Sequence, residues 1–239
     1  MTVYEKLLKD IPPLPIEEIL VGVYSVLVKT AKSTGIASTV KYGKMHSSIG
    51  KVKQLEQKNL REIAELVYSE NLIAASLGMA AINCYWAGHE QNDIPINGKE
   101  IIRERGREKT VGVIGHFPFV EIDRDVYKKL LIFEKFPQKG DLEEKDIPMY
   151  LPQADVVALT ATTLTNHTFH DVIQHMSPDS YKIILGPSTP LSQVLFDYGF
   201  HAVCGTRIRD YDHVRKQVAL ATPIRYLEGV EFVGILNEK

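Results

Sequence analysis

The segment TVGVIGHFPFV, residues 110–120, decides the fold class of this chain. A short β-branched run, Val111–Ile114, ends at Gly115 and His116, which is typical of a buried strand followed by a tight turn. Four more short apolar runs follow, and amphipathic segments separate them. This alternation predicts βαβ units and a mostly parallel sheet, the pattern of a Rossmann-like α/β/α domain.

The predicted elements of the C-terminal part share this alternation. The strands are Val111–Ile114, Leu130–Phe133, Val156–Thr160, Lys182–Leu185 and Ala202–Cys204, with an edge strand within Tyr226–Leu236. The helices are Asp123–Lys129, Thr165–Met176, Pro190–Tyr198 and Tyr211–Leu220, the last capped by Asp210.

The N-terminal part has a different, α+β pattern. Its predicted elements are a helix at Thr2–Lys9, a strand at Glu17–Thr30, a hairpin partner at Ile36–Tyr42, and helices at Asn59–Ser69 and Leu72–Ala87. A polar linker, Gly88–Lys109, follows and contains a short helix near Lys99–Arg105. We therefore expect an α+β domain over residues 1–98 and a Rossmann-like domain over residues 99–239.

Composition bounds the function classes. The 239 residues are 44% hydrophobic and carry a formal charge of -2, which gives no electrostatic basis for binding nucleic acid or an anionic membrane. No apolar run reaches the ~20 residues that span a bilayer. No signal peptide is expected, so we expect a cytoplasmic protein. Cys84 and Cys204 belong to no CxxC motif, which favours two reduced, buried thiols over a disulfide or a zinc site.

Polar residues follow each predicted strand of the C-terminal domain. Ligands of open parallel sheets bind beyond the carboxyl ends of the strands. These positions carry Gly115 and His116, then Glu134, then the cluster Thr162–Thr168, then Gly186 to Thr189, then Gly205 and Arg207. Thr189 before Pro190 predicts a helix start. Glu134 stands about twenty residues past the glycines, where a Rossmann domain places the acid that holds a ribose.

His116 is the best candidate for a proton-transfer group or a metal ligand, since it follows a glycine at a strand end. His167 and His170 lie three residues apart on a predicted helix but lack a third ligand, which favours ordinary surface histidines. Asn83 is an amide within an apolar helix, and its partners could be backbone groups or a ligand.

Four segments together resemble an uncharacterised family described as "putative heavy-metal chelation". They are VGVIGHFPFV (residues 111–120), ADVVALTATTLTNHTFHDVI (residues 154–173), GPSTPL (residues 186–191) and Cys204-Gly205. The resemblance implies an enolase-N-terminal-like domain, a Rossmann-like domain and a ligand site in the cleft between them. The positions that it assigns to this site, together with the adjacent Gly115, are Asn83, His116, Glu134, Thr163, Asn166, Gly186, Ser188 and Gly205. It does not imply enolase chemistry, because this chain is too short to contain the enolase barrel.

Three functions remain open at this point. The first is binding of a metal ion, such as a divalent ion, or of a small polar or anionic ligand in the cleft. Heavy-metal chelation would then need a bound organic molecule, since the sequence lacks a cluster of soft ligands. The second is an enzyme with a nucleotide-type cofactor, S-adenosylmethionine or NAD, although the glycine fingerprint is incomplete. The third is a cofactor-free enzyme with His116 as acid or base. The apolar Leu72–Trp86 helix also suggests a homodimer.

Overall fold

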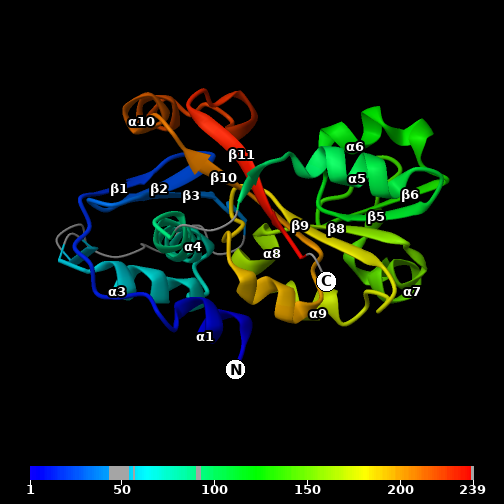
Figure 1. The fold of residues 1–239 in the computed structure, drawn as a ribbon, viewed down its shortest axis with the longest axis horizontal. Helices are drawn as coiled ribbons and strands as arrows, with labels where there is room; N and C mark the ends of the chain where they lie inside the picture. Colours follow the sequence, from blue (N-terminus) through cyan, green and yellow to red (C-terminus); the bar gives the residue numbers. More distant parts are fainter. Residues whose placement is uncertain (43–53, 56, 90–92, 238–239) are drawn as a thin grey trace.

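The computed structural model describes residues 1–42, 54–55, 57–89 and 93–237 and contains two sheets (Figure 1). The small sheet has the antiparallel order β1-β2-β3, with bounds Glu18–Val21, Ser25–Lys29 and Thr34–Ser38. The large sheet has the order β4-β11-β10-β9-β8-β5-β6-β7. Its strands are β4 Ile94–Pro95, β5 Thr110–Ile114, β6 Lys129–Glu134, β7 Leu142–Glu143, β8 Val156–Thr160, β9 Tyr181–Leu185, β10 Ala202–Ile208 and β11 Val230–Leu236.

Six neighbouring strands of the large sheet are parallel, from β7 through β10. The chain starts at β5 in the middle, adds β6 and β7 on one side, and then adds β8, β9 and β10 on the other. This is the 3-2-1-4-5-6 order of doubly wound sheets. The direction in which successive strands are added to the sheet reverses between β5 and β8. The predicted mostly parallel α/β fold is therefore confirmed.

Helices cover both faces of the large sheet. On one face, α5 (Gly98–Gly106) and α6 (Pro118–Ile122) pack their apolar side chains against those of alternate strand residues such as Val113 and Ala158. On the other face lie α7 (Ile147–Tyr150), α8 (Thr162–Thr165) and α9 (Phe169–Ile173), which contact the intervening residues such as Phe133. The period of two along each strand thus divides the core into two layers.

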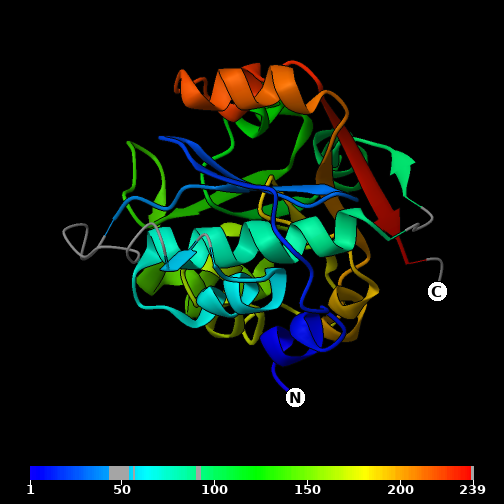
Figure 2. The same cartoon turned by 90° about the vertical axis from the view of Figure 1, so that its left-hand side faces the viewer.

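The small sheet lies between helices from distant parts of the sequence. On one face lies α4 (Leu72–Ala87), which Asn71 caps by accepting the N–H groups of Ile73 and Ala74. On the other face, α10 (Tyr211–Ala219) packs Val214 and Val218 against the sheet. Figure 2 shows the orange α10 above the blue strands and the blue-green α4 below them. The predicted bounds of α4 are confirmed.

The apolar surface of α4 is covered within the chain. Its residues from Ala74 to Tyr85 are all buried, and they pack with α1 (Val3–Leu8), α3 (Leu60–Ala64) and the small sheet. The apolar surface of α4 is therefore no evidence for the expected homodimer, which remains a prediction.

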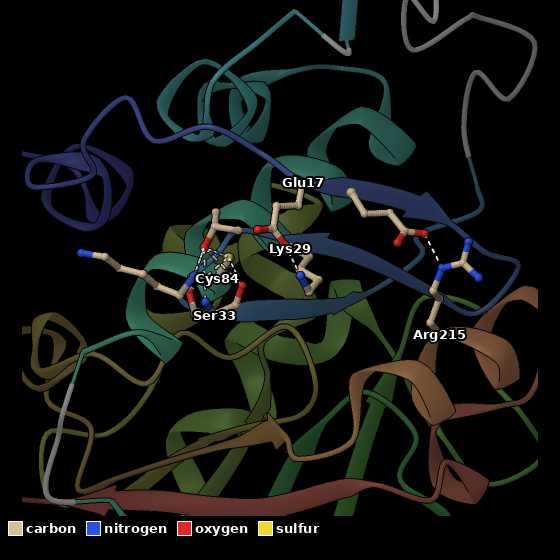
Figure 3. Close-up of polar contacts among 8 residues, drawn as sticks. Glu17, Lys29, Ser33, Cys84 and Arg215 are labelled. Atoms are coloured by element: carbon tan, nitrogen blue, oxygen red, sulfur yellow. Dashed lines mark hydrogen bonds and ion pairs between the residues drawn. The ribbon is translucent and has the colours of Figure 1, made fainter.

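Polar contacts fasten the edges of this arrangement (Figure 3). Arg215 on α10 forms an ion pair with Glu18 on β1, and Lys29 pairs with Glu17 across the β1–β2 hairpin. The Ser33 hydroxyl donates to the carbonyl oxygen of Cys84 at 2.7 Å, which ties the β2–β3 turn to α4.

Two predictions in the N-terminal part and at the start of the Rossmann-like part are wrong. The predicted strand Glu17–Thr30 is two strands, because the N–H of Gly22 donates to the oxygen of Ser25 at 2.9 Å and closes a turn. The β-branched run conceals this turn. The predicted helix Asp123–Lys129 is only a 3₁₀ turn over Arg124–Val126, since α6 ends at Ile122 and β6 already begins at Lys129.

Two further helix predictions are wrong in their bounds. The predicted helix Thr165–Met176 is interrupted, because α8 ends at Thr165 and α9 covers only Phe169–Ile173. His167, between the two helices, has a φ of 67°. The predicted helix Pro190–Tyr198 is a 3₁₀ helix over Gln193–Tyr198 that Ser192 caps, not Thr189. The tail strand β11 is not an edge strand, because β4 pairs outside it. Asp210 caps α10 as predicted.

None of the helices in the described ranges combines the length and the apolarity that crossing a bilayer demands. Part of the predicted linker, residues 90–92, lies outside the described residues.

Gly35 provides a test of the packing of the small sheet on α4. A Cβ atom at this position would lie 2.1 Å from both the oxygen of Ala80 and the nitrogen of Cys84. We expect Gly35→Ala to lower the free energy of unfolding by about 3 kcal/mol, because rigid backbone atoms must separate. The measurement is the urea midpoint with an unchanged m-value.

The control is Gly140→Ala. Gly140 has a φ of 101°, but no heavy atom lies within 4 Å of its would-be Cβ. We expect a loss of about 1 kcal/mol from backbone strain alone. Equal losses in the two variants would contradict the close contact between β3 and α4.

Candidate functional site

A pocket of about 280 Å³ lies at the carboxyl ends of β5, β6 and β8, where the strand order reverses. We call it the switch-point pocket. Its polar lining consists of Tyr42, His116, Glu134, Lys135, Glu144, Thr160, Thr162, Thr163, Asn166 and Thr168. The reversal separates the loops after β5 and β8, which leaves room for a ligand between them.

The Glu134 carboxylate fixes the loop after β5. One oxygen accepts the backbone N–H of His116 at 2.8 Å, and the other accepts the N–H of Lys135 at 2.9 Å. Each carboxylate oxygen can accept a second hydrogen bond. Glu134 is therefore both an anchor for His116 and an acceptor on the wall of the pocket.

The imidazole of His116 lies between two carboxylates. Its Nδ1 is 3.1 Å from Asp141, whose side chain is only 3% exposed and also accepts the N–H of Gln138. Its Nε2 is 3.4 Å from the more exposed Glu121. The buried Asp141 favours the tautomer with the proton on Nδ1, which leaves Nε2 facing the more exposed Glu121. This geometry is that of an oriented acid–base group.

Sequence reasoning missed Asp141. It lies 25 residues from His116, in a turn before the two-residue strand β7, which no apolar pattern announces. The turn glycine, Gly140, was the sole local signal.

Tyr42 brings the N-terminal part of the chain to the pocket. Asn166 donates its amide N–H to the Tyr42 hydroxyl at 2.6 Å, while its amide oxygen accepts from the hydroxyl of Thr168 at 2.7 Å. Lys135 Nζ lies 4.7 Å from the centre of the Tyr42 ring. Burial raises the pKa of the Tyr42 phenol. Tyr42 was predicted only as the end of a hairpin strand.

Three further expected site residues also have protein partners. The hydroxyl of Thr163 donates to the oxygen of Thr160 at 2.7 Å. The Asn83 amide donates to the oxygens of Ile36 and Pro187, at 2.7 and 3.1 Å. The Ser188 hydroxyl accepts the N–H of Ser38 at 3.0 Å. Asn83 and Ser188 thus join α4 and β3 to the loop after β9.

Gly186 and Gly205 line a second, larger cavity of about 660 Å³. We call it the aromatic cavity and define it by Ile96, Phe117, Phe119, Leu185, Pro187 and Phe232. The structure thus separates the expected ligand residues. The switch-point pocket contains Gly115, His116, Glu134, Thr163 and Asn166, the aromatic cavity contains the two later glycines, and Asn83 and Ser188 line neither.

The described residues do not fit a heavy-metal ion held by protein groups alone. No group of three or more histidine, cysteine or acidic side chains is arranged to hold a metal within the described ranges. Thiolate is the ligand form of cysteine, but both thiols are buried. Burial raises the pKa of Cys204 to about 12 and also raises that of Cys84.

The chain is similar to several proteins without an assigned function. Two family models, DUF364 and DUF4213, match residues 98–231 and 4–86, and both carry the description "putative heavy-metal chelation". An uncharacterised protein of Methanocaldococcus jannaschii is 27% identical over 208 residues, which are 83% of this chain and 79% of that protein.

Two solved structures share the fold. A DUF364-family protein of unknown function from Desulfitobacterium hafniense is 25% identical, with a TM-score of 0.83 over 98% of this chain and 97% of its own. A DUF364-family protein of unknown function from Pyrococcus horikoshii is 18% identical, with a TM-score of 0.83 over 98% of each chain.

Asp141→Asn tests the orientation of His116. We expect His116 to carry its proton on Nδ1 in the unaltered protein and to lose this preference in the variant, because the buried acceptor becomes a neutral amide. Long-range ¹H–¹⁵N NMR of the imidazole nitrogens gives the tautomer. Glu121→Gln is the control, and its Nδ1 proton should remain. An unchanged tautomer in Asp141→Asn would exclude Asp141 as the orienting group.

The two thiols provide a test of the metal chemistry. At pH 8 a thiol with a pKa near 12, such as Cys204, is ionised in roughly one molecule in 10,000. Burial also raises the pKa of Cys84, so we expect both cysteines to react very slowly with 5,5′-dithiobis(2-nitrobenzoate) in the folded protein. In guanidinium chloride two equivalents should react at once, one for each cysteine of the chain. Rapid reaction of the native protein would show that a thiol is available to soft metals.

Proposed function

The chain belongs to the family described as "putative heavy-metal chelation", and on that premise we propose that it binds a small polar molecule in the switch-point pocket. The observation that carries the proposal is the His116 imidazole, held by the buried Asp141 at the point where the strand order reverses. Polar groups that converge in a pocket at such a point are typical of a ligand site.

The lining groups favour a ligand that donates hydrogen bonds, such as one with hydroxyl or amine groups. Glu134 and Glu144 present carboxylate oxygens, and Thr160 and Thr162 present hydroxyls. Among the described lining residues Lys135 is the one lysine, and it lies 4.0 Å from Glu144, which partly neutralises its charge. Phosphate is less well supported, because the helix after β5 has five residues and begins at Pro118, which has no N–H to donate.

His116 would act as the acid–base group of this site. A ligand that displaces the exposed Glu121 would meet Nε2, while Asp141 keeps Nδ1 protonated. Chelation, as the family description names it, would then belong to the bound molecule rather than to protein side chains.

A nucleotide-type cofactor such as S-adenosylmethionine or NAD is the second candidate. The strand order and the place of Glu134 at the end of β6 favour it. The glycines argue against it. A Cβ at Gly112 would lie 2.9 Å from Leu151, which indicates a packing role. Of the two glycines Gly112 and Gly115, only Gly115 has a positive φ. Saturable thermal stabilisation by either cofactor, reduced in Glu134→Gln, would favour this candidate over the first.

Native mass spectrometry with elemental analysis of freshly purified protein tests the first candidate. We expect a non-protein mass in the unaltered protein that is lost in His116→Ala, because the imidazole lines the pocket. His213→Ala is the matched control, since His213 lies exposed on α10 beside Glu228, and it should keep the mass.

Retention of the mass in His116→Ala would place the ligand elsewhere. If every sample is bare polypeptide, a panel of small amines and polyols should bind the unaltered protein and not His116→Ala. No binding by any of them would rule out the proposal.

A further inference from the structure

We propose that the aromatic cavity is a second binding site, which takes a flat apolar molecule that carries one anionic group. The cavity and the switch-point pocket share Phe117 in their linings, but their other apolar lining residues belong to opposite faces of the large sheet. Leu185 and Cys204 line the aromatic cavity and belong to the core beneath α5 and α6. Ile114 and Phe133 line the switch-point pocket and belong to the core beneath α8 and α9.

The walls of the cavity suit a planar ring system. The rings of Phe117 and Phe119 lie 5.4 Å apart at an interplanar angle of 29°, and Phe232, 48% exposed, stands at the rim. A flat ligand can stack on such rings and bury its apolar faces. The volume of about 660 Å³ falls within the roughly 300–1,000 Å³ that small-molecule sites occupy.

The charges at the cavity favour an anion. The described lining includes no aspartate, glutamate, histidine or lysine, and Arg225 is its one charged residue. Arg225 stacks on Tyr226 with its guanidinium carbon 4.7 Å from the ring centre. A second cation, Lys41, lies 4.2 Å from the ring centre of the lining residue Tyr24. A carboxylate at the rim would therefore lie in a region of positive charge.

The lining also contains the polar residues Thr206 and Asn97. The Thr206 hydroxyl is buried and has no hydrogen-bond partner among the described residues. It shares the cavity face with Cys204, two residues earlier on β10. The Asn97 side-chain oxygen accepts the N–H of Lys99. Gly186, with a φ of 115°, leaves open space where a side chain would stand.

The test uses three naphthalene probes whose 2-substituents are anionic, neutral and cationic: 2-naphthoate, 2-naphthalenemethanol and 2-(aminomethyl)naphthalene. Their dissociation constants are measured by isothermal titration calorimetry with the full chain. We expect saturable 1:1 binding, tightest for the carboxylate and weakest for the amine.

Two variants locate the probe. Arg225→Gln should weaken naphthoate about threefold and leave the alcohol unchanged, since an exposed ion pair contributes modestly. Phe119→Ala should weaken the carboxylate and the alcohol alike, by about tenfold, because each loses the same apolar contact. Arg107→Gln, an exposed arginine beyond the other end of α5, is the matched control and should behave as the unaltered protein.

His116→Ala separates this proposal from the proposed function. It should leave naphthoate binding unchanged, since His116 does not line the aromatic cavity. No saturable binding, a preference for the amine, or affinities unchanged in both Arg225→Gln and Phe119→Ala would each overturn the proposal. Loss of naphthoate binding in His116→Ala would assign the probe to the switch-point pocket instead.

Discussion

The Asn83 side chain makes the contact on which both candidate sites depend. Its amide, on the fully packed helix α4, donates both to β3 and to the loop that follows β9. Ser188 adds a second link between the same loop and β3. Buried amides left without partners cost about 1–3 kcal/mol, so this junction has a strong preference for one geometry. It holds the small sheet against the carboxyl end of the large sheet, where Tyr42 meets one cavity and Ser38 and Thr39 meet the other.

Local pattern was enough to predict the parallel sheet and α4. Short apolar strands and one long apolar helix owe their conformations to nearest neighbours in the sequence and to burial. The same reasoning failed where a β-branched run concealed the turn at Gly22, and where the positive φ of His167 separates α8 from α9. Each of these breaks depends on one hydrogen bond or one backbone angle, which the residue types alone do not predict.

The candidate site was predictable in part. Strand ends identify the edge of the sheet where polar residues gather, and His116, Glu134 and Asn166 do lie together there. The positions of the strand ends do not predict on which face of the sheet the following loop lies. Gly186 and Gly205 therefore could not be assigned to a different cavity from the sequence. Asp141 and Tyr42 reach the pocket from distant segments, and a single sequence contains no record of such contacts. The nature of the ligand therefore had to be argued from the lining charges.

The position of α10 has a consequence for synthesis of the chain. Val214 and Val218 cover the face of the small sheet formed by Leu27 and Ile36, about 180 residues earlier in the sequence. The ribosome releases the strands long before it makes the helix that covers them. During elongation, this face stays exposed to water and to other nascent chains, a state that favours aggregation. Contacts at such sequence separation also slow folding. The chain can therefore complete its N-terminal layer only after residues 211–219 have left the exit tunnel.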